Sequence, residues 1–220
     1  MLIRPLRRRV LTSCRTYCAL AAVLLLLMGS LPVDAAPKDQ ERWNRKYSTD
    51  KYLFGKQPIA FLQQNLHLLP KGKTLDIAMG EGRNGVFLAT KGFQVTGLDI
   101  SDRGLEKART LAKERGVTIT TKVVDLESHQ LEKNAYDVVL CTYYLQRDLF
   151  PQIKDALKRG GIAVVETYTM EHQQYRPRFR KEYLLHTNEL LELFEGFTII
   201  RYQLVDNGQA AYASLIARKP

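Results

Sequence analysis

The chain has 220 residues, of which 45% are hydrophobic and 25% are charged, so it has the composition of a globular protein that can bury a real core. This length fits one domain once an N-terminal leader is set aside. The formal net charge is +10, but outside the leader Lys and Arg do not form runs interleaved with aromatic residues, so the charge does not indicate a nucleic-acid-binding protein.

Residues 1–35 have the pattern of a signal peptide. A basic stretch with five arginines precedes an apolar run at 19–28, and small residues follow up to Ala35. We expect cleavage after Ala35. An uncleaved membrane anchor is the second choice, because the apolar run is short for a bilayer span of ~20 residues. The arginines at 7–9 also resemble a twin-arginine export signal. The protein is therefore expected to be periplasmic or anchored to a membrane by this segment.

Two of the three cysteines, Cys14 and Cys18, lie in the leader. Cys141 alone remains, so no internal disulfide is expected, and the apolar residues around it in the sequence indicate burial. The four histidines are scattered, and no spacing of His and Cys suggests a metal site.

Residues 36–58 are polar with aromatic side chains set among them, and we expect a segment that covers the domain rather than a core element. Apolar residues with helical spacing follow at 59–69, and Pro70 ends that pattern. The expected organisation is a leader at 1–35, a cover segment and helix at 36–71, and the main domain at 72–220.

From residue 74 onward, short apolar strands alternate with helices. Strands are expected at 74–78, 93–98, 117–124, 136–141 and 162–168, and helices at 84–91, 101–115 and 149–157. Strand–helix–strand units with short connections predict a parallel sheet with right-handed crossovers. The expected fold class is α/β, with a Rossmann-like doubly wound sheet.

The C-terminal part departs from this alternation. Residues 170–183 are polar and basic without a clear period and are expected to form a loop or lid, and Thr187 is expected to cap a helix at 188–194. Strand-like runs at 197–204 and 210–217 flank Asn207-Gly208, which is a strong hairpin signal. The sheet is therefore expected to be mostly parallel and to close with an antiparallel hairpin, which is not the usual nicotinamide-binding arrangement.

A glycine-rich turn joins the first strand to its helix. Gly80, Gly82 and Gly85 allow a tight turn and the close approach of a ligand to the free N–H groups of the helix start. The spacing also fits the dinucleotide fingerprint, which is a weak signal by itself. Asp76 and Glu81 bracket the turn, however, and two like charges about 4 Å apart repel by roughly 4 kcal/mol at an effective dielectric near 20. A pyrophosphate is therefore disfavoured, and a nucleoside that carries an ammonium and a sulfonium is favoured.

The segment Asp76-x-Ala78-x-Gly80-x-Gly82 resembles the first motif of the class I S-adenosylmethionine-dependent methyltransferases. The resemblance covers residues 72–218 and implies the seven-stranded methyltransferase fold, with S-adenosyl-L-methionine as the cofactor. In that family this loop holds the methionine part of the cofactor. Asp99 falls where the family's acidic residue binds both ribose hydroxyls, and Asp125 with Leu126 falls where the family places its adenine contacts.

Other segments are similar to the tellurite-resistance group of that family. These segments are Trp43-Asn44-x-x-Tyr47, Tyr52-x-Phe54-Gly55-x-x-Pro58, the runs 76–84 and 143–147, and Arg176-Pro177-Arg178. The group implies the fold and the cofactor firmly and the methyl acceptor only loosely. The leader departs from this group, whose members are normally cytoplasmic, and this leaves the compartment open.

The resemblance also implies which residues line the cofactor. Ile100 and Leu126 would flank the adenine, although packing in the core is an equal alternative for both. Arg83 and Asn84 would reach the carboxylate of the cofactor, and the ring of Trp43 or Tyr47 would face the sulfonium. The expected cofactor-binding residues are Trp43, Tyr47, Asp76, Ala78, Gly80, Gly82, Arg83, Asn84, Asp99, Ile100, Asp125, Leu126, Cys141 and Tyr143.

The methyl acceptor is expected to be a small molecule, such as a chalcogen oxyanion or a thiol. An anionic acceptor would be attracted by a basic cluster formed by Arg176, Arg178, Arg180 and Lys181. No catalytic residue is assigned, and the candidates for a general base are Tyr143, Glu166, His172 and His186. Two other functions stay open: a nicotinamide-dependent oxidoreductase, and a non-catalytic nucleoside-binding protein on the same fold.

Overall fold

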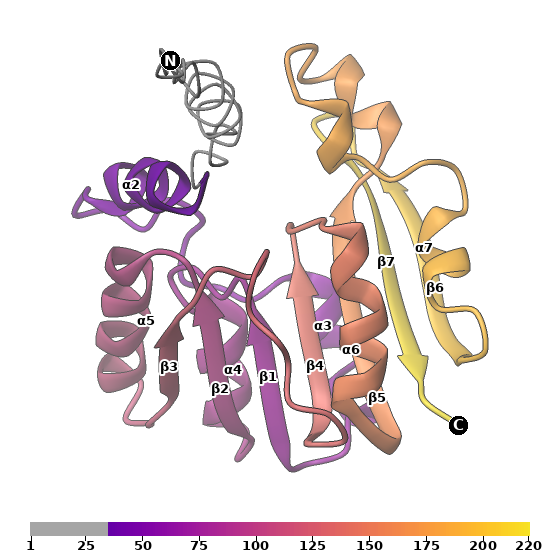
Figure 1. Cartoon of the computed structure of the whole chain (residues 1–220), viewed down its shortest axis with the longest axis horizontal. Helices are drawn as coiled ribbons and strands as arrows, with labels where there is room; N and C mark the ends of the chain where they lie inside the picture. The colour runs from indigo at the N-terminus through magenta and orange to yellow at the C-terminus, as the bar shows by residue number, and fades with distance from the viewer. Residues whose placement is uncertain (1–34) are drawn as a thin grey trace, which may run out of the picture. The chain divides into compact units, whose positions relative to one another are not determined.

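Seven strands form one mixed sheet in the computed structural model (Figure 1). The structure describes residues 35–220, so the predicted leader, apart from Ala35, lies outside the described residues. The order across the sheet is β3-β2-β1-β4-β5-β7-β6. The strands are β1 (Lys73–Ile77), β2 (Gln94–Asp99), β3 (Thr120–Val123), β4 (Tyr136–Thr142), β5 (Leu157–Tyr168), β6 (Thr198–Asp206) and β7 (Ala211–Arg218).

The first five strands are parallel, and β7 lies between β5 and β6 and is antiparallel to both. This confirms the predicted mostly parallel sheet with an antiparallel C-terminal hairpin. The chain order along the sheet reverses between β1 and β4. In open α/β sheets, ligands bind beyond the carboxyl ends of the strands at such a reversal.

Helices cover both faces of the sheet. They are α3 (Ala60–Gln64), α4 (Arg83–Thr90), α5 (Asp102–Glu114), α6 (Phe150–Ala156) and α7 (Glu189–Leu193). One core joins α3, α4 and α5 to the sheet and includes Leu62, Leu88 and Leu105. The other core joins α6 and α7 to the opposite face and includes Phe150 and Leu190.

The central strand β4 is buried on both faces. Val138, Val139 and Leu140 are 0% exposed and Cys141 is 1% exposed. Because helices cover both faces of the sheet, the sequence of β4 is continuously apolar at 138–141 and does not alternate between apolar and polar residues there. The predicted burial of Cys141 is confirmed.

The N-terminal segment is more regular than predicted. A helix of 13 residues, α2 (Ala35–Tyr47), occupies a stretch expected only as an aromatic-bearing cover. The helix expected at 59–69 is shorter, because α3 ends before Asn65 and a 3₁₀ turn, η1 (Leu66–Leu68), follows. Residues 36–220 form one compact unit, so the segment at 36–71 folds together with the main domain.

The C-terminal part differs from the prediction at the start of α7. Thr187 is not its cap, because Asn188 precedes the helix with φ +61° and no side-chain cap is formed. The Glu189 carboxylate instead accepts a hydrogen bond from the His186 N–H at 2.8 Å. Residues 170–183, expected as a loop or lid, contain two short 3₁₀ helices, η3 (Met170–Gln174) and η4 (Lys181–Tyr183).

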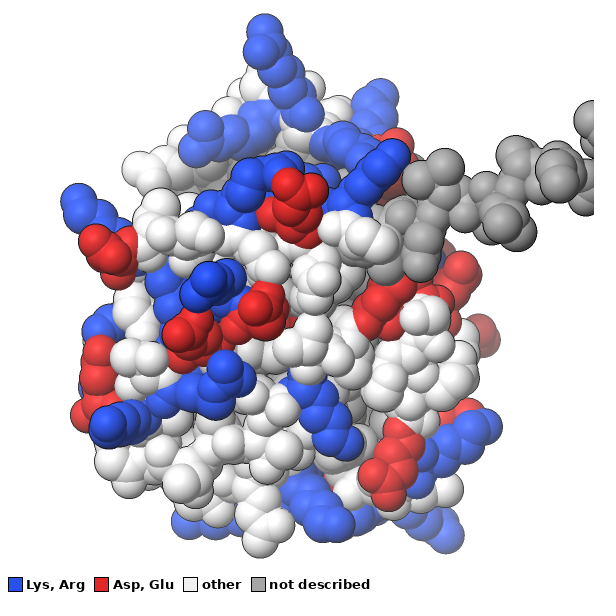
Figure 2. Space-filling model, turned by 60° about the vertical axis from the view of Figure 1, so that its left-hand side comes forward, with Lys and Arg blue, Asp and Glu red and all other residues white. Residues whose placement is uncertain are grey.

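Charges of both signs are interspersed on the face drawn in Figure 2. Exposed charges of the described residues form ion pairs, such as Lys56 with Glu114 (2.6 Å) and Arg103 with Glu106 (3.1 Å). Over residues 35–220, none of the helices is both long enough and apolar enough to cross a bilayer.

Candidate functional site

Three carboxylates lie at the carboxyl ends of three neighbouring strands. Asp76 is the next-to-last residue of β1, Asp99 is the last residue of β2, and Asp125 follows β3 by two residues. Burial raises the pKa of the Tyr144 hydroxyl, and the charges of Asp125 and Asp99 both add to this rise. The strands β1, β2 and β3 are parallel neighbours, with Asp76 opposite Gly97 and Asp99 opposite Val123, so the three acids lie at one edge of the sheet.

Asp99 binds the glycine turn and the start of α5 at once. Its Oδ2 accepts a hydrogen bond from the Gly80 N–H (2.7 Å), and its Oδ1 accepts one from the Ser101 N–H (2.8 Å). Burial raises the pKa of Asp99, while the N–H groups of Ser101, Gly80 and Ile100 act in the opposite direction. A carboxylate has about four lone pairs and three N–H groups face this one, so the 6% exposed Asp99 keeps one acceptor position for a hydroxyl group.

Asp76 is a buried carboxylate with an incomplete set of partners. It is 2% exposed, and within residues 35–220 its Oδ2 finds no hydrogen-bond partner. Burial raises the pKa of Asp76 to about 7; the Gly85 N–H opposes this rise, and the charge of Asp99 adds to it. A partly unsatisfied carboxylate beside a second one favours a cationic ligand.

Other residues of the protein pack closely against the glycines of the turn. Gly80 and Gly82 have φ values of +56° and +84°, which a side chain rarely adopts. A Cβ on Gly80 would lie 2.7 Å from the Tyr47 hydroxyl, and one on Gly82 would lie 2.7 Å from the Cβ of Ala108 in α5. These glycines were expected to admit a ligand, whereas the closest neighbours of Gly80 and Gly82 are Tyr47 and α5. A ligand would meet the turn through its backbone N–H groups.

Glu81 does not direct its charge at the ligand, contrary to the expectation. It is 3% exposed and accepts hydrogen bonds from Lys107 Nζ (2.9 Å) and from the N–H groups of Leu53 (3.1 Å) and Phe54 (3.2 Å). Lys107 neutralises it, so Glu81 holds the cover segment in place. The charge argument against a pyrophosphate therefore rests on Asp76, to which the structure adds Asp99.

Helix α2 packs over the glycine turn and the start of α5, and we call this helix, residues 35–47, the roof of the turn. The hydroxyl of Tyr47 lies beside Gly80, and its ring lies against Gly104, where a Cβ would come within 3.0 Å of it. Asn44 Oδ1 accepts a hydrogen bond from Ser101 Oγ (2.6 Å). These contacts place the hydroxyl end of Tyr47 next to the glycine turn.

Trp43 is half-buried and stacks on Tyr47, with 5.5 Å between the ring centroids. The ammonium of Lys46 lies 4.2 Å from the centroid of the Trp43 ring. Since Trp43 already faces a cation of the protein, Tyr47 is the better placed of the two expected aromatic residues.

Asn84 ties three parts of the fold together. Its Oδ1 accepts a hydrogen bond from the Ile59 N–H (3.0 Å), and its Nδ2 donates one to Thr142 Oγ1 (2.9 Å). Asn84 thus has a structural role, and the second N–H of its amide is left for the contact that is expected with the cofactor's carboxylate. Its neighbour Arg83 donates to the Phe54 carbonyl (3.1 Å) and remains half-exposed.

The remaining residues expected near the ribose and adenine differ in burial and in their contacts. Ala78 follows β1 with φ +51°, and Ile100 is half-buried. Asp125 accepts a hydrogen bond from the Glu127 N–H (3.0 Å) and is also half-buried. Leu126 is 5% exposed and packs in the core beneath α6, so the alternative of core packing describes it.

Cys141 is enclosed in the same core. Its thiol donates to the Tyr144 carbonyl at 3.4 Å. Burial raises the pKa of Cys141 to about 12, and the charge of Asp76 adds to this rise. Plain burial, the alternative reading of this residue, is what the structure shows.

Tyr143, just beyond β4, is bound to a buried carboxylate. Its hydroxyl donates to Glu166 Oε1 (2.7 Å), and Ser214 Oγ donates to Glu166 Oε2 (2.7 Å). Two of the four candidate bases are thus joined to each other. Ser214 was missed, because it belongs to no motif and acquires its partner only in the folded sheet. Tyr144 lies in the run 143–147 but was not among the expected site residues.

The two candidate histidines have other surroundings. His172 is buried and stacks on Tyr168 with 4.0 Å between ring centroids, and its Nδ1 accepts a hydrogen bond from the Ala211 N–H (3.4 Å). Burial lowers the pKa of His172, and the charge of Arg176 adds to this effect. His186 is exposed and lines a separate cavity.

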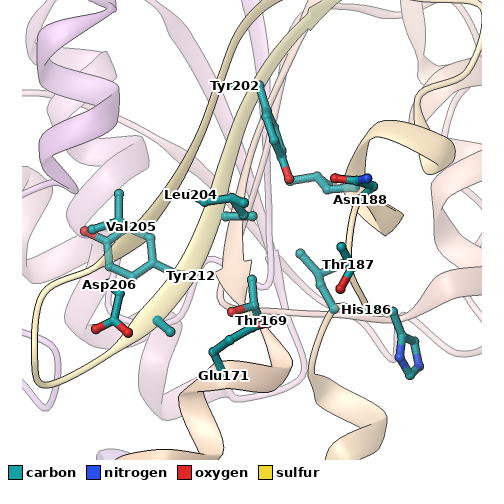
Figure 3. Close-up of a pocket in the computed structure, with 14 residues that line it drawn as sticks. Thr169, Glu171, His186, Thr187, Asn188, Tyr202, Leu204, Val205, Asp206 and Tyr212 are labelled. Carbon is teal, nitrogen blue, oxygen red and sulfur yellow. The ribbon is translucent and has the colours of Figure 1, made fainter.

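That cavity has a volume of about 290 Å³ and lies between the end of β5, the loop before α7 and the β6–β7 hairpin (Figure 3). Thr169, Asn188 and Tyr202 belong to its wall, and the Tyr202 hydroxyl points toward Asn188. None of its lining residues is an expected cofactor residue. We therefore place the site by the carboxylates and the glycine turn.

A family model described as a methyltransferase domain matches residues 74–161, from β1 into β5. This segment of the chain is therefore similar to a methyltransferase domain, in line with the resemblance to the class I S-adenosylmethionine-dependent methyltransferases. The matched segment carries the glycine turn, Asp76, Asp99, Asp125 and Tyr143, which are the residues that the structure brings to one edge of the sheet.

Individual relatives agree with this assignment. Ubiquinone biosynthesis O-methyltransferase of Rickettsia felis is 30% identical over 112 residues, which cover 49% of this chain and 46% of that protein. The probable S-adenosyl-L-methionine-dependent methyltransferase TehB of Haemophilus influenzae is 23% identical over 165 residues, which cover 67% of this chain and 57% of that protein. The chain spans about half the length of the curated relatives that it matches.

Solved structures show the same fold. The crystal structure of TehB from Haemophilus influenzae has a TM-score of 0.63 at 19% identity and covers 82% of this chain and 67% of that one. Geranyl diphosphate C-methyltransferase from Streptomyces coelicolor A3(2) has a TM-score of 0.65 at 15% identity and covers 86% of this chain and 100% of that one. At these identities the similarity concerns the fold alone.

S-adenosyl-L-methionine is the cofactor of the methyltransferase domain, and the residues at the site fit it. Asp99 keeps one acceptor position for a ribose hydroxyl, Asp76 has a carboxylate oxygen without a hydrogen-bond partner within residues 35–220, and the Tyr47 hydroxyl lies beside the glycine turn. When bound, the cofactor supplies a methyl group that is already activated, so the domain has to hold and orient the reactants. The comparisons give no support to the nicotinamide-dependent alternative.

Proposed function

We propose that the protein transfers the methyl group of S-adenosylmethionine to a small-molecule acceptor at the carboxyl ends of β4 and β5. The observation that carries the proposal is the pair of buried carboxylates, Asp76 and Asp99, beside a glycine turn at the reversal of strand order. The Tyr143–Glu166 pair lies on the next strands of the same edge, where an acceptor would meet the donor. No nucleic-acid partner is proposed.

A chalcogen oxyanion or a thiol is the narrower proposal for the acceptor. It is supported by the resemblance of the sequence to the tellurite-resistance group and by the basic cluster at 176–181. Arg176 lowers the pKa of His172, behind the larger effect of burial, so at least this arginine approaches the aromatic residues beyond β5. The similarity to O-methyltransferases of ubiquinone biosynthesis favours a hydroxyl acceptor instead.

The proposal is tested first by binding. Calorimetry with S-adenosylhomocysteine is expected to show one site, and ligand at 100 times its dissociation constant should stabilise the protein by about 2.7 kcal/mol. NADH serves as the control and is expected to give no shift. Methyl transfer from labelled cofactor is then measured against tellurite, selenite, an aliphatic thiol and a catechol. Absence of S-adenosylhomocysteine binding would contradict the proposal.

The compartment depends on residues 1–34. Export to the periplasm or anchoring to a membrane remains a proposal based on the sequence of that segment. Sequencing the N-terminus of the mature protein distinguishes a cleaved leader from a retained anchor.

A further inference from the structure

Tyr143 is held in one conformation at the carboxyl end of β4. Its φ of +56° lies in the left-handed region, which costs a non-glycine residue on the order of 1–3 kcal/mol unless the surroundings impose it. Its N–H donates to the Glu166 carbonyl (2.7 Å), and its ring lies 4.9 Å from the Tyr168 ring. The Arg83 guanidinium lies 5.5 Å from the centroid of the Tyr143 ring. The phenol is therefore positioned before any ligand arrives.

Both hydrogen bonds accepted by the Glu166 carboxylate come from hydroxyl groups. Tyr143 donates to one oxygen and Ser214 to the other, each at 2.7 Å, and Gln203 supports Ser214 with a bond of 3.3 Å. Glu166 is 3% exposed. Hydroxyl donors satisfy a buried carboxylate without adding positive charge, so Glu166 keeps the ability to take up a proton.

The electrostatics assign different roles to the two groups. Burial raises the pKa of Tyr143 far above the neutral range, so the phenol keeps its proton at rest. Burial also raises the pKa of Glu166, which makes it a stronger base than an exposed glutamate. The other titratable groups that face this pair are Arg83 from α4, Tyr168 from β5 and Tyr212 from β7. The carboxylate is thus the base, and the phenol is a relay to it.

The Tyr143–Glu166 pair lies next to the strand and the turn that are expected to bind the methyl donor, S-adenosylmethionine. Tyr143 follows β4, which is paired with β1, the strand that carries Asp76. Arg83, whose guanidinium lies over the Tyr143 ring, directly follows Gly82 of the turn. Tyr143 is only half-buried, so it is the member of the pair that an acceptor can reach.

We propose that Glu166, acting through the Tyr143 hydroxyl, accepts the proton of a neutral hydroxyl or thiol group that is being methylated. The oxygen or sulfur of the acceptor forms a bond to the methyl carbon as the carbon–sulfonium bond breaks and leaves its electron pair on sulfur. The acceptor's proton moves to the Tyr143 oxygen, and the Tyr143 proton moves to Glu166 Oε1. This inference rests on the proposed methyl transfer and names its second substrate as a proton-bearing nucleophile.

The test compares Tyr143→Phe and Glu166→Gln with the wild type, and Tyr202→Phe is the matched control because it removes a tyrosine hydroxyl from β6. Acceptors are catechol and 2-mercaptoethanol, which carry a proton at neutral pH, and tellurite and selenite, which are anions. We expect the wild type to methylate a proton-bearing acceptor. Both variants are expected to lose at least ~100-fold in kcat, the lower range of general-base effects, with KM and S-adenosylhomocysteine affinity within threefold of wild type.

The pH profile adds a readout that a purely structural role would not change. The wild-type kcat is expected to rise as Glu166 ionises, above the ordinary pKa of glutamate, and this rise should be absent in Glu166→Gln. If Glu166→Gln does not fold, the inference is tested by the kcat of Tyr143→Phe, which keeps the aromatic ring.

Three results would overturn the inference: methylation confined to the two anions, undiminished turnover in both variants, or methylation of no acceptor by a protein that binds S-adenosylhomocysteine. A wild type that does not bind S-adenosylhomocysteine at all overturns the proposed function as well, so the two failures are distinguishable.

Discussion

The N–H of Gly80 lies 2.7 Å from Oδ2 of Asp99, so the turn after β1 is held by the carboxylate at the end of β2. These two elements are expected to contact different parts of the cofactor, the methionine end and the ribose. Their direct bond means that a change at either one also alters the other. Cofactor affinity and local stability are therefore coupled at this point.

Asp99→Asn is expected to weaken S-adenosylhomocysteine binding by about 10–100-fold, because hydrogen bonds to a charged acceptor contribute roughly 1.5–3 kcal/mol. The amide also replaces one acceptor oxygen with a donor that faces the N–H of Gly80 or Ser101. Calorimetry measures the affinity. Asp102→Asn, on the exposed first turn of α5, is the control and should bind normally. Unchanged affinity in Asp99→Asn would exclude contact with the ribose.

Gly82→Ala is expected to destabilise the protein more than Gly92→Ala. The two glycines have nearly equal φ values, +84° and +85°, so both substitutions carry the same backbone strain of about 1–2 kcal/mol. A Cβ at Gly92 meets nothing within 4 Å, whereas one at Gly82 would lie 2.7 Å from the Cβ of Ala108. Overpacking typically adds about 1–3 kcal/mol. Urea unfolding of the two variants measures the difference, and equal losses would refute the close contact between α4 and α5.

Asp76 is expected to make the ligand-free protein less stable as the pH rises. Its folded pKa of about 7 lies above its ordinary value of 3.8, so its favourable contribution is complete below about pH 4 and is lost as the pH rises through 7. At 1.36 kcal/mol per unit, the loss is on the order of 4 kcal/mol. Urea unfolding at pH 5 and pH 8 should show a smaller decline for Asp76→Asn than for the wild type. Parallel declines would mean that another group titrates.

Lys107→Met is expected to destabilise the protein by about 3–5 kcal/mol, because it leaves the buried Glu81 carboxylate without its counter-ion. The side chains of Lys107 and Glu81 are 16% and 2% exposed, and their charges are 2.9 Å apart. Adding Glu81→Gln should restore part of the stability, and a double-mutant cycle in urea measures the coupling. Limited proteolysis should cut Lys107→Met faster near Leu53, whose N–H is bound by Glu81. Additive effects would show that the ion pair is unimportant.

Features that depend on neighbouring residues could be predicted from the sequence. Asp76, Asp99 and Asp125 each follow an apolar strand, and parallel strands bring their carboxyl ends to one edge, so local pattern and fold class suffice. Likewise, Ser101 caps α5 by accepting the Gly104 N–H at 3.0 Å, as its position before the helix predicts.

Features that depend on distant partners could not be predicted in this way. From its place in the glycine turn, Glu81 was expected to face a ligand, yet Lys107, 26 residues away, neutralises it. Glu166 acquires its donors from Tyr143 and Ser214, and the latter lies 48 residues away on an antiparallel strand. The helix α2 is polar because most of its surface faces solvent, so its sequence has no apolar stripe that would reveal its contact with the turn.

The chain has a single tryptophan, and that residue, Trp43, lies in the helix that roofs the glycine turn and stacks on Tyr47. Its intrinsic emission therefore reports on this roof alone, without any attached dye. Stopped-flow recordings of that emission would follow any change in the surroundings of Trp43 while a nucleoside binds.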